Sequence, residues 1–309
     1  MCKAKINKEI DLDWSEIITL LGLNISSDHL RKTAYGLLEY DNYINGLENT
    51  SQVSQRILTI SDAHVPFNLP ADTFAKYKNK VDVLIFNGDI EDCYSCSQFS
   101  KKYRVSVGEE MIATRQYFID VINLLKPKKV IIAKGNHEVR LGRFLNEKLN
   151  DSIMDIMPDS PLELIVNEGF RVKDRKSKTN DWYKPLTKVF KNKCEIVYNG
   201  DWYVKVGKTI FVHPLSYSSG MLKTTEKAVN YFLRIDRDFN ALVMAHTHRI
   251  GSYVQGGIKM YEQGCVCDNS QIDYADGKLF LPSQNGFMYI CQDENGDIID
   301  SKTKIEILN

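Results

Sequence analysis

Five short polar runs contain most of the side chains in this sequence that could bind a metal. They are Ser61-Asp62-Ala63-His64, Asn87-Gly88-Asp89-Ile90-Glu91-Asp92, Lys134-Gly135-Asn136-His137-Glu138, His213-Pro214 and Ala245-His246-Thr247-His248. Imidazole suits Zn, Fe and Ni, and carboxylate oxygens favour Mn and Mg. One carboxylate can bridge two cations, and two cations about 3.5–4 Å apart can clamp a phosphoryl group. These residue types therefore predict a two-metal site for phosphoester chemistry.

The histidines strengthen this interpretation. Five of the six lie in the polar runs, and only His29 lies elsewhere. A single histidine is often a core or surface residue without a chemical role. Five of them, grouped with two aspartates and an asparagine, favour a metal site.

Each polar run follows a short apolar segment that is typical of a buried strand. These segments are 56–60, 81–86, 129–133, 209–212 and 241–244, and residues 109–125 have helical periodicity. Strands that alternate with helices predict an α/β layered domain. Side chains at the carboxyl ends of such strands converge on one crevice, so we expect the polar runs to meet. Two further strands are expected near the C-terminus, at 287–291 and 298–299, and residues 140–208 are predicted to be an insertion.

The N-terminal region has a different pattern. Residues 12–48 are predicted to be helical, with Gly22 ending a first helix and Ser26 or Ser27 capping a second. Two helices joined by a tight turn have a helix-turn-helix shape. A polar stretch at 48–55 is predicted to be a linker. We therefore expect a helical segment at 1–50 and a catalytic domain at 56–309.

The motifs in order are Asp-x-His, Gly-Asp-x-x-Asp, Gly-Asn-His-Glu, a lone His and His-x-His. This order resembles the calcineurin-like metallophosphoesterase superfamily over about residues 56–290. The resemblance implies a layered αββα sandwich. It also implies a hydrolase with two divalent metal ions, with Mn expected and Zn, Fe, Ni or Mg as alternatives.

The resemblance also implies a role for each site residue. Three residues would hold the first metal: Asp62, His64 and His248. Three would hold the second: Asn136, His213 and His246. Asp89 would bridge both metals, opposite a hydroxide that attacks the phosphorus. His137 would contact the phosphate and protonate or stabilise the leaving oxygen, a general-acid role. Asp92 would orient His137, or would only begin a helix.

Some positions depart from the family pattern. The protein Ser/Thr phosphatase branch has arginines where this chain has Cys93 and Lys134, which puts a protein-phosphatase function in doubt. Glycines usual before the last two motifs are replaced by Val212 and Ala245, and neither change removes a ligand. The whole chain, including Cys265-Val266-Cys267-Asp268, resembles metallophosphoesterases of bacteriophages and prophages, which implies a nucleic-acid or nucleotide substrate.

We expect a phosphodiesterase or nuclease that acts on nucleic acid or nucleotides. A phosphomonoesterase or atypical protein phosphatase is the alternative enzyme. A metal-containing binding module without catalysis is the alternative of another class.

Composition is that of a soluble globular protein. The 309 residues include 40 basic and 40 acidic side chains, so no global charge attracts nucleic acid or a membrane. Seven cysteines and no apolar leader predict reduced thiols in a cytosolic protein. Cys93 and Cys96 have a spacing that suits zinc, whereas Cys265 and Cys267 are too close for the usual loop; buried thiols are the favoured interpretation of both pairs.

Local charge distinguishes two substrate-binding regions. Residues 1–60 carry six basic and eight acidic groups, which weakens a DNA-binding role for residues 12–48 and leaves protein docking open. Residues 168–193 carry nine basic and three acidic groups with interleaved aromatics, a pattern that can hold single strands. A solvated loop is the alternative. From this segment we predict four substrate-binding residues: Arg171, Lys173, Arg175 and Lys176.

Overall fold

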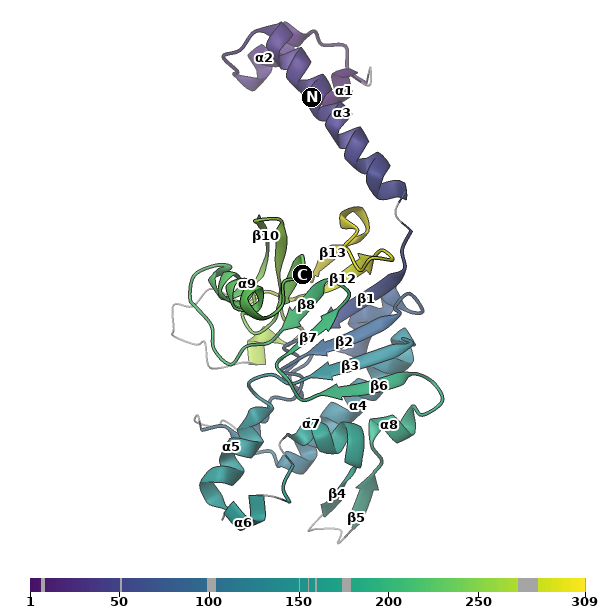
Figure 1. The fold of residues 1–309 in the computed structure, drawn as a ribbon, viewed down its shortest axis with the longest axis vertical. Helices are drawn as coiled ribbons and strands as arrows, with labels where there is room; N and C mark the ends of the chain where they lie inside the picture. The colour runs from purple at the N-terminus through teal and green to yellow at the C-terminus, as the bar shows by residue number, and fades with distance from the viewer. Residues whose placement is uncertain are drawn as a thin grey trace. The chain divides into compact units, whose positions relative to one another are not determined.

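The computed structural model describes residues 1–6, 9–50, 52–98, 104–149, 151–154, 156–158, 160–173, 179–271 and 283–308. The chain divides into two compact units, Met1–Gln52 and Val53–Asn309. Figure 1 shows the elements of each unit.

The first unit consists of helices. They are α1 (Cys2–Ile6), α2 (Trp14–Leu21) and α3 (Ser27–Thr50). Gly22 ends α2 with a φ of 62°, as predicted, and the Ser26 hydroxyl accepts the His29 N–H at the start of α3. Ile17 is fully buried in this small unit. Because α3 continues to Thr50, the predicted linker at 48–55 is shorter than expected.

The second unit has two sheets. The first contains, in spatial order, β13 (Lys304–Ile307), β12 (Gly286–Gln292), β1 (Gln55–Ile60), β2 (Val83–Asn87), β3 (Lys129–Ala133) and β6 (Glu195–Asn199). β1, β2, β3 and β6 are parallel to one another, whereas β12 pairs antiparallel with both β1 and β13. The second contains β10 (Ile250–Gln255), β11 (Ile258–Gln263), β9 (Ala241–Met244), β8 (Thr209–Val212) and β7 (Tyr203–Val206).

Alternating side chains of β2 define the layers. Val83 and Ile85 pack between the sheets with Phe211 of β8. Leu84 and Phe86 pack on the opposite face, where α4 (Val107–Leu125) covers the first sheet.

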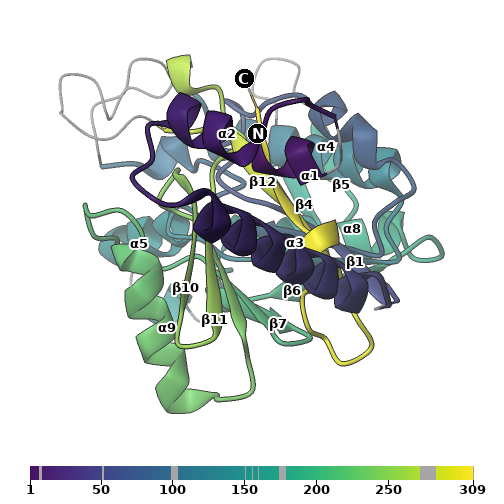
Figure 2. The ribbon, with the colours of Figure 1, turned by 90° about the horizontal axis from the view of Figure 1, so that it is seen from above.

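On the far side, α9 (Lys223–Ile235) covers the second sheet through Ala228 and Phe232, which pack with Leu242 of β9. Figure 2 shows α9 beside β10 and β11. The predicted αββα sandwich is confirmed.

Short elements complete the second unit. They are η1 (Ala71–Tyr77), η2 (Tyr94–Cys96), α5 (Val139–Lys148), α6 (Asp151–Met154), α7 (Pro161–Glu163), η3 (Leu164–Glu168), the hairpin of β4 (Phe170–Lys173) and β5 (Asn180–Tyr183), α8 (Leu186–Val189), η4 (Asn269–Gln271) and η6 (Asp300–Lys302). Among the helices of the described residues, none is long and apolar enough to cross a bilayer.

Two expectations require correction. The segment 140–208 is not an insertion throughout, because β6 and β7 belong to the two main sheets. Both are half-buried edge strands without a continuous apolar run, so their pattern did not stand out. Residues 298–299 do not form a strand: Ile298 makes one isolated bridge to Gln292, and the last strand is β13.

We expect a chain that begins at Gln52 to fold and to hydrolyse a small phosphodiester at the rate of the full chain. The physical reason is that the second unit contains every predicted metal ligand and the three hydrophobic clusters of the sandwich. Circular dichroism tests whether the shortened chain folds, elemental analysis gives its metal content, and bis-p-nitrophenyl phosphate reports its rate of hydrolysis. An insoluble or metal-free truncated protein would contradict the expectation.

Candidate metal centre

The ends of five strands deliver the predicted ligands to one place. Asp62 and His64 follow β1, and Asp89 follows β2. Hydrogen bonds join these two loops directly, from Asp62 N to Gly88 O at 3.1 Å and from His64 N to Asp89 O at 3.0 Å. Asn136 follows β3, His213 follows β8, and His246 and His248 follow β9. The parallel strands of both sheets therefore position the site.

The loop backbones adopt an uncommon conformation to do this. Asp62, His64, Asp89, His246 and His248 all have φ between 49° and 71°. Non-glycine residues rarely adopt this left-handed region, and such residues concentrate at functional sites. Five predicted ligands share it, so the loops hold these side chains in place at the expense of local backbone stability.

One group of ligands comprises Asp62, His64 and His248. The Nε2 atoms of the two histidines lie 3.2 Å apart, and His248 Nε2 lies 3.2 Å from Asp62 Oδ1. All three side chains are buried. The residues assigned to the first metal thus direct their donor atoms at one point.

A second group forms around His213. Its Nε2 atom lies 3.2 Å from Asp89 Oδ2 and 3.1 Å from Asn136 Oδ1. The rings of His213 and His246 have centroids 5.2 Å apart. A donor atom of His246 lies within 4.8 Å of both Asp89 and His213. The three residues assigned to the second metal therefore also converge, and Asp89, the predicted bridge, lies among them.

Outer hydrogen bonds orient two of the imidazoles. His213 Nδ1 lies 2.9 Å from the Asn87 carbonyl oxygen, and His64 Nδ1 lies 3.0 Å from Asp92 Oδ1. A carbonyl oxygen only accepts, so His213 Nδ1 carries the proton, and the carboxylate favours the same tautomer at His64. The Nε2 atoms then face the centre, as ligand histidines require.

Two buried polar atoms show that this centre fits cations. Among the described residues, His246 Nε2 has no hydrogen-bond partner, and Asp62 Oδ1 has a contact with His248 Nε2 at 3.2 Å, which does not have the geometry of a hydrogen bond. Buried polar atoms are almost always paired, so an unpaired one implies a missing ion or water. Carboxylate and imidazole donors match the divalent metals expected from the sequence.

The charges of the centre agree with this fit. Burial works to raise the pKa of Asp62, but His213 and His248 outweigh it and hold that pKa below its usual range. Burial acts to lower the pKa of His213, yet Asp89 and Asp62 raise it to about 9. Burial, together with the charge of His213, lowers the pKa of His246 to about 4. The carboxylates are therefore ionised, and His213 holds a proton that a cation would displace.

Asp92 and His137 lie beside the first group. Asp92 Oδ1 is 3.0 Å from His137 Nδ1 and also 3.0 Å from His64 Nδ1. His137 Nε2 lies 3.7 Å from Asp89 Oδ2, and the His137 N–H donates to Asp89 Oδ1 at 2.8 Å. One carboxylate thus contacts both a predicted ligand and the predicted acid. The sequence did not indicate the contact with His64.

Two residues near the centre received no role from the sequence. Glu138, fully buried, accepts N–H groups of Asp89, Ile90 and Glu91 from one loop and of Gly135 from another. Burial raises the pKa of Glu138 to about 7. Glu138 therefore joins two ligand loops, and its place directly after His137 was the available signal.

Arg140 is the other residue. Its Nη2 atom lies 2.7 Å from His137 Nε2, and its Nη1 donates to the Asp92 carbonyl oxygen at 2.9 Å. Its position in the first turn of α5, three residues after His137, could have indicated this proximity.

The loops also leave no space for larger residues. A Cβ on Gly88 would collide with the His213 ring, and one on Gly135 would collide with the Asp89 carboxylate. Both glycines precede a predicted ligand.

Both closely spaced cysteine pairs are buried. Cys93, Cys96, Cys265 and Cys267 take part in no disulfide among the described residues. Cys93 and Cys96 belong to no metal-binding group among the described residues. Donor atoms of Cys265 and Cys267 lie within 4.8 Å of each other and of His248.

Two of the four predicted substrate-binding residues lie on the hairpin of β4 and β5. Arg171 and Lys173 belong to β4, and Arg175 and Lys176 lie outside the described residues. The Arg171 guanidinium lies 5.3 Å from the centre of the Trp182 ring on β5. Trp182 in turn is 46% exposed, so this pair is accessible to a ligand.

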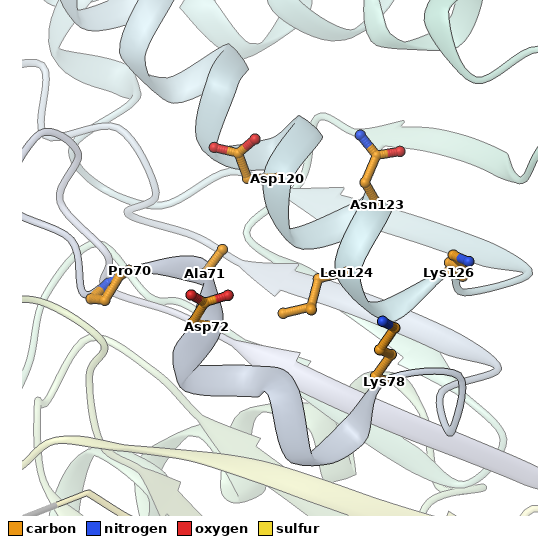
Figure 3. Close-up of a pocket in the computed structure, with 8 residues that line it drawn as sticks. All are labelled: Pro70, Ala71, Asp72, Lys78, Asp120, Asn123, Leu124 and Lys126. Atoms are coloured by element: carbon orange, nitrogen blue, oxygen red, sulfur yellow. The ribbon is translucent and has the colours of Figure 1, made fainter.

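A pocket of about 550 Å³ lies between η1 and α4 (Figure 3). It is lined by Pro70, Ala71, Asp72, Lys78, Asp120, Asn123, Leu124 and Lys126. None of these is a predicted ligand. The pocket is therefore separate from the metal centre.

Comparisons with solved structures show only a general likeness. Vacuolar Protein Sorting 29 from Cryptosporidium parvum is 15% identical, with a TM-score of 0.39, and the match covers 84% of this chain and 100% of that chain. An archaeal phosphodiesterase is 13% identical, with a TM-score of 0.38 and coverage of 82% and 99%. A zinc complex of Vps29 from Entamoeba histolytica is 13% identical, with a TM-score of 0.37 and coverage of 82% and 98%. These values are too low to support a functional argument.

The search of curated proteins found no match. The family comparison gave a firm result, because residues 55–249 match the family described as calcineurin-like phosphoesterase. This range is more than half of the chain, and it includes all five polar runs. The chain therefore belongs to the calcineurin-like phosphoesterase family.

Proposed function

We propose that this protein is a metal-dependent phosphodiesterase that acts on nucleic acid or nucleotides. The observation that carries the proposal is the convergence of seven ligand-type side chains beside His137. One of their atoms, His246 Nε2, has no hydrogen-bond partner among the described residues. Two bound divalent cations would neutralise phosphoryl charge and activate water. A binding module without catalysis would have no need of a histidine held beside such a centre.

The protein's own residues divide the remaining tasks. Asp62, His64 and His248 would hold one cation, Asn136, His213 and His246 the other, and Asp89 both. Asp92 holds His137 through Nδ1, which directs His137 Nε2 toward Asp89. From there His137 can donate a proton to the leaving oxygen.

Two features support a nucleotide or polynucleotide substrate. The ring of Tyr217 lies 5.4 Å from the His246 ring and is about half exposed, so a base bound beside the metals could stack on it. The exposed Trp182 with Arg171 offers a second aromatic and cationic surface. A phosphomonoesterase remains the alternative, and a substrate panel of p-nitrophenyl phosphate, its diester, cyclic nucleotides and DNA discriminates the two.

Metal removal is the first test of the proposal. A chelator should abolish hydrolysis of bis-p-nitrophenyl phosphate, and Mn²⁺ or Ni²⁺ should restore it, because the attacking water would be activated by a bound divalent cation. His248→Ala should lose metal by elemental analysis. His29→Ala is the matched control, since His29 is exposed on α3, and it should keep both metal and activity. Full activity in metal-free protein would reject the proposal.

His137→Ala should lower the rate by about 10²–10⁴, the usual contribution of a general acid or base. The variant should keep its metals, because His137 is not among the proposed ligands. Elemental analysis and steady-state kinetics measure the two effects separately. Loss of metal in this variant would mean that the roles of Asn136 and His137 are wrongly assigned.

Polynucleotide binding should depend on the basic segment 168–193. Replacement of Arg171, Lys173, Arg175 and Lys176 by serine should weaken single-stranded DNA binding and flatten its salt dependence, because each lost phosphate contact removes counterion release. Hydrolysis of the small diester should not change. Arg31→Ser with Lys32→Ser in the first unit is the control. If only this control weakens binding, the helical unit recruits the substrate instead.

A further inference from the structure

Arg140 places a positive charge beside the Nε2 atom of His137. The side chain starts from the first turn of α5, and its backbone N–H donates to the His137 carbonyl oxygen at 2.9 Å. Its Nη2 atom then reaches His137 Nε2 at 2.7 Å. This is the nitrogen that lies 3.7 Å from Asp89 Oδ2. The guanidinium therefore lies at the edge of the metal centre.

The hydrogen bonds of Arg140 fix which atoms donate. A guanidinium has five N–H donors and no acceptor, so His137 Nε2 is the acceptor in this arrangement. Nη1 donates to the Asp92 carbonyl oxygen at 2.9 Å, and the Asp92 carboxylate lies farther away, at 3.7 Å. Among the described residues, these contacts use one N–H on each terminal nitrogen. The remaining N–H groups of the guanidinium can therefore donate to an incoming anion.

A phosphoryl group fits this position better than the imidazole does. Planar guanidinium groups bind phosphate oxygens with two parallel hydrogen bonds, and bonds to a charged acceptor are stronger than bonds to a neutral nitrogen. The Arg140 side chain is 19% exposed, so its charge is only partly screened by solvent. An arriving phosphate would accept the Arg140 N–H that now points at His137 Nε2. That nitrogen would then face the substrate and be able to carry the proton that it donates to the leaving oxygen.

We propose that Arg140 binds the non-bridging oxygens of the phosphoryl group at the metal centre. This inference rests on the proposed phosphoesterase function. It assigns the cationic contact to α5, one turn after the Gly135-Asn136-His137 motif. The ligand class is a tetrahedral phosphate or phosphate ester.

Inorganic phosphate is the probe, titrated into the full-length, metal-loaded protein by calorimetry and as a competitive inhibitor. Arg140→Gln should weaken phosphate binding about 10–100-fold, the range expected for hydrogen bonds to a charged group. Metal content should stay at the wild-type level. Arg140→Lys keeps the positive charge but not the planar pair of donors, and it should reduce phosphate affinity by a factor between those of wild type and Arg140→Gln. Arg143→Gln is the control, since Arg143 is exposed one turn along the same helix and should behave as wild type.

A double variant separates phosphate binding from orientation of His137. In a His137→Ala background, Arg140→Gln should still weaken phosphate binding by the same factor. If the effect disappears there, Arg140 acts only through His137 and the inference is wrong. Unchanged phosphate affinity in metal-replete Arg140→Gln, or failure of the metal-loaded wild type to bind phosphate, also overturns it. A wild type that binds phosphate through Arg140 but hydrolyses no ester would reject the proposed function alone.

Discussion

The concentration of ionisable groups at the ends of the strands is the constraint on which the rest of the second unit depends. Asp62, Asp89 and His213 are almost completely removed from water, although ionised groups are costly to bury unless they are paired or bound to metal. Their mutual contacts satisfy part of this requirement, and His246 Nε2 has no hydrogen-bond partner in the part of the chain that the structure describes. Divalent cations would balance the negative charge of the buried carboxylates. The geometry and the electrostatics of this centre therefore both favour a metal site.

The loops that carry these groups need support of their own. Left-handed backbone conformations at five ligand positions cost stability, and the surrounding structure must hold them. Glu138 supplies this support to the loop that carries Asp89, because its buried carboxylate accepts backbone N–H groups from the loops after β2 and β3. Gly88 and Gly135 allow the close approach. A site assembled in this way is rigid at its base, as precise positioning of a phosphoryl group requires.

Around this base, the charged and aromatic surfaces are of a different kind. Tyr217 beside His246 and the Arg171–Trp182 pair belong to loops and a small hairpin, where sequence can change without disturbing the sandwich. Arg140 belongs neither to the ligand loops nor to these peripheral segments, because it lies on a helix that begins shortly after His137. The metal centre thus supports the chemistry, while the more peripheral groups are suited to choose what is bound.

The sequence by itself indicated a layered α/β domain and the side chains that meet in the centre, and the resemblance of its motifs to a known family implied the αββα sandwich. Short continuous apolar runs that end in polar clusters indicate strands buried on both faces, and parallel strands bring their carboxyl ends together, so Asp62, Asp89 and Asn136 were expected to be neighbours. β6, β7 and β13 escaped detection because half-buried edge strands lack such runs.

Only the tertiary structure decided which atoms face one another. Asp92 contacting both His64 and His137, Glu138 joining two loops, and Arg140 reaching His137 Nε2 all depend on side-chain directions and loop conformations. Local sequence does not encode the contacts of Asp92 and Glu138, because the loops after β1, β2 and β3 become neighbours only when these strands pair in the first sheet. Arg140 lies only three residues after His137, but the direction of its guanidinium depends on the loop conformation.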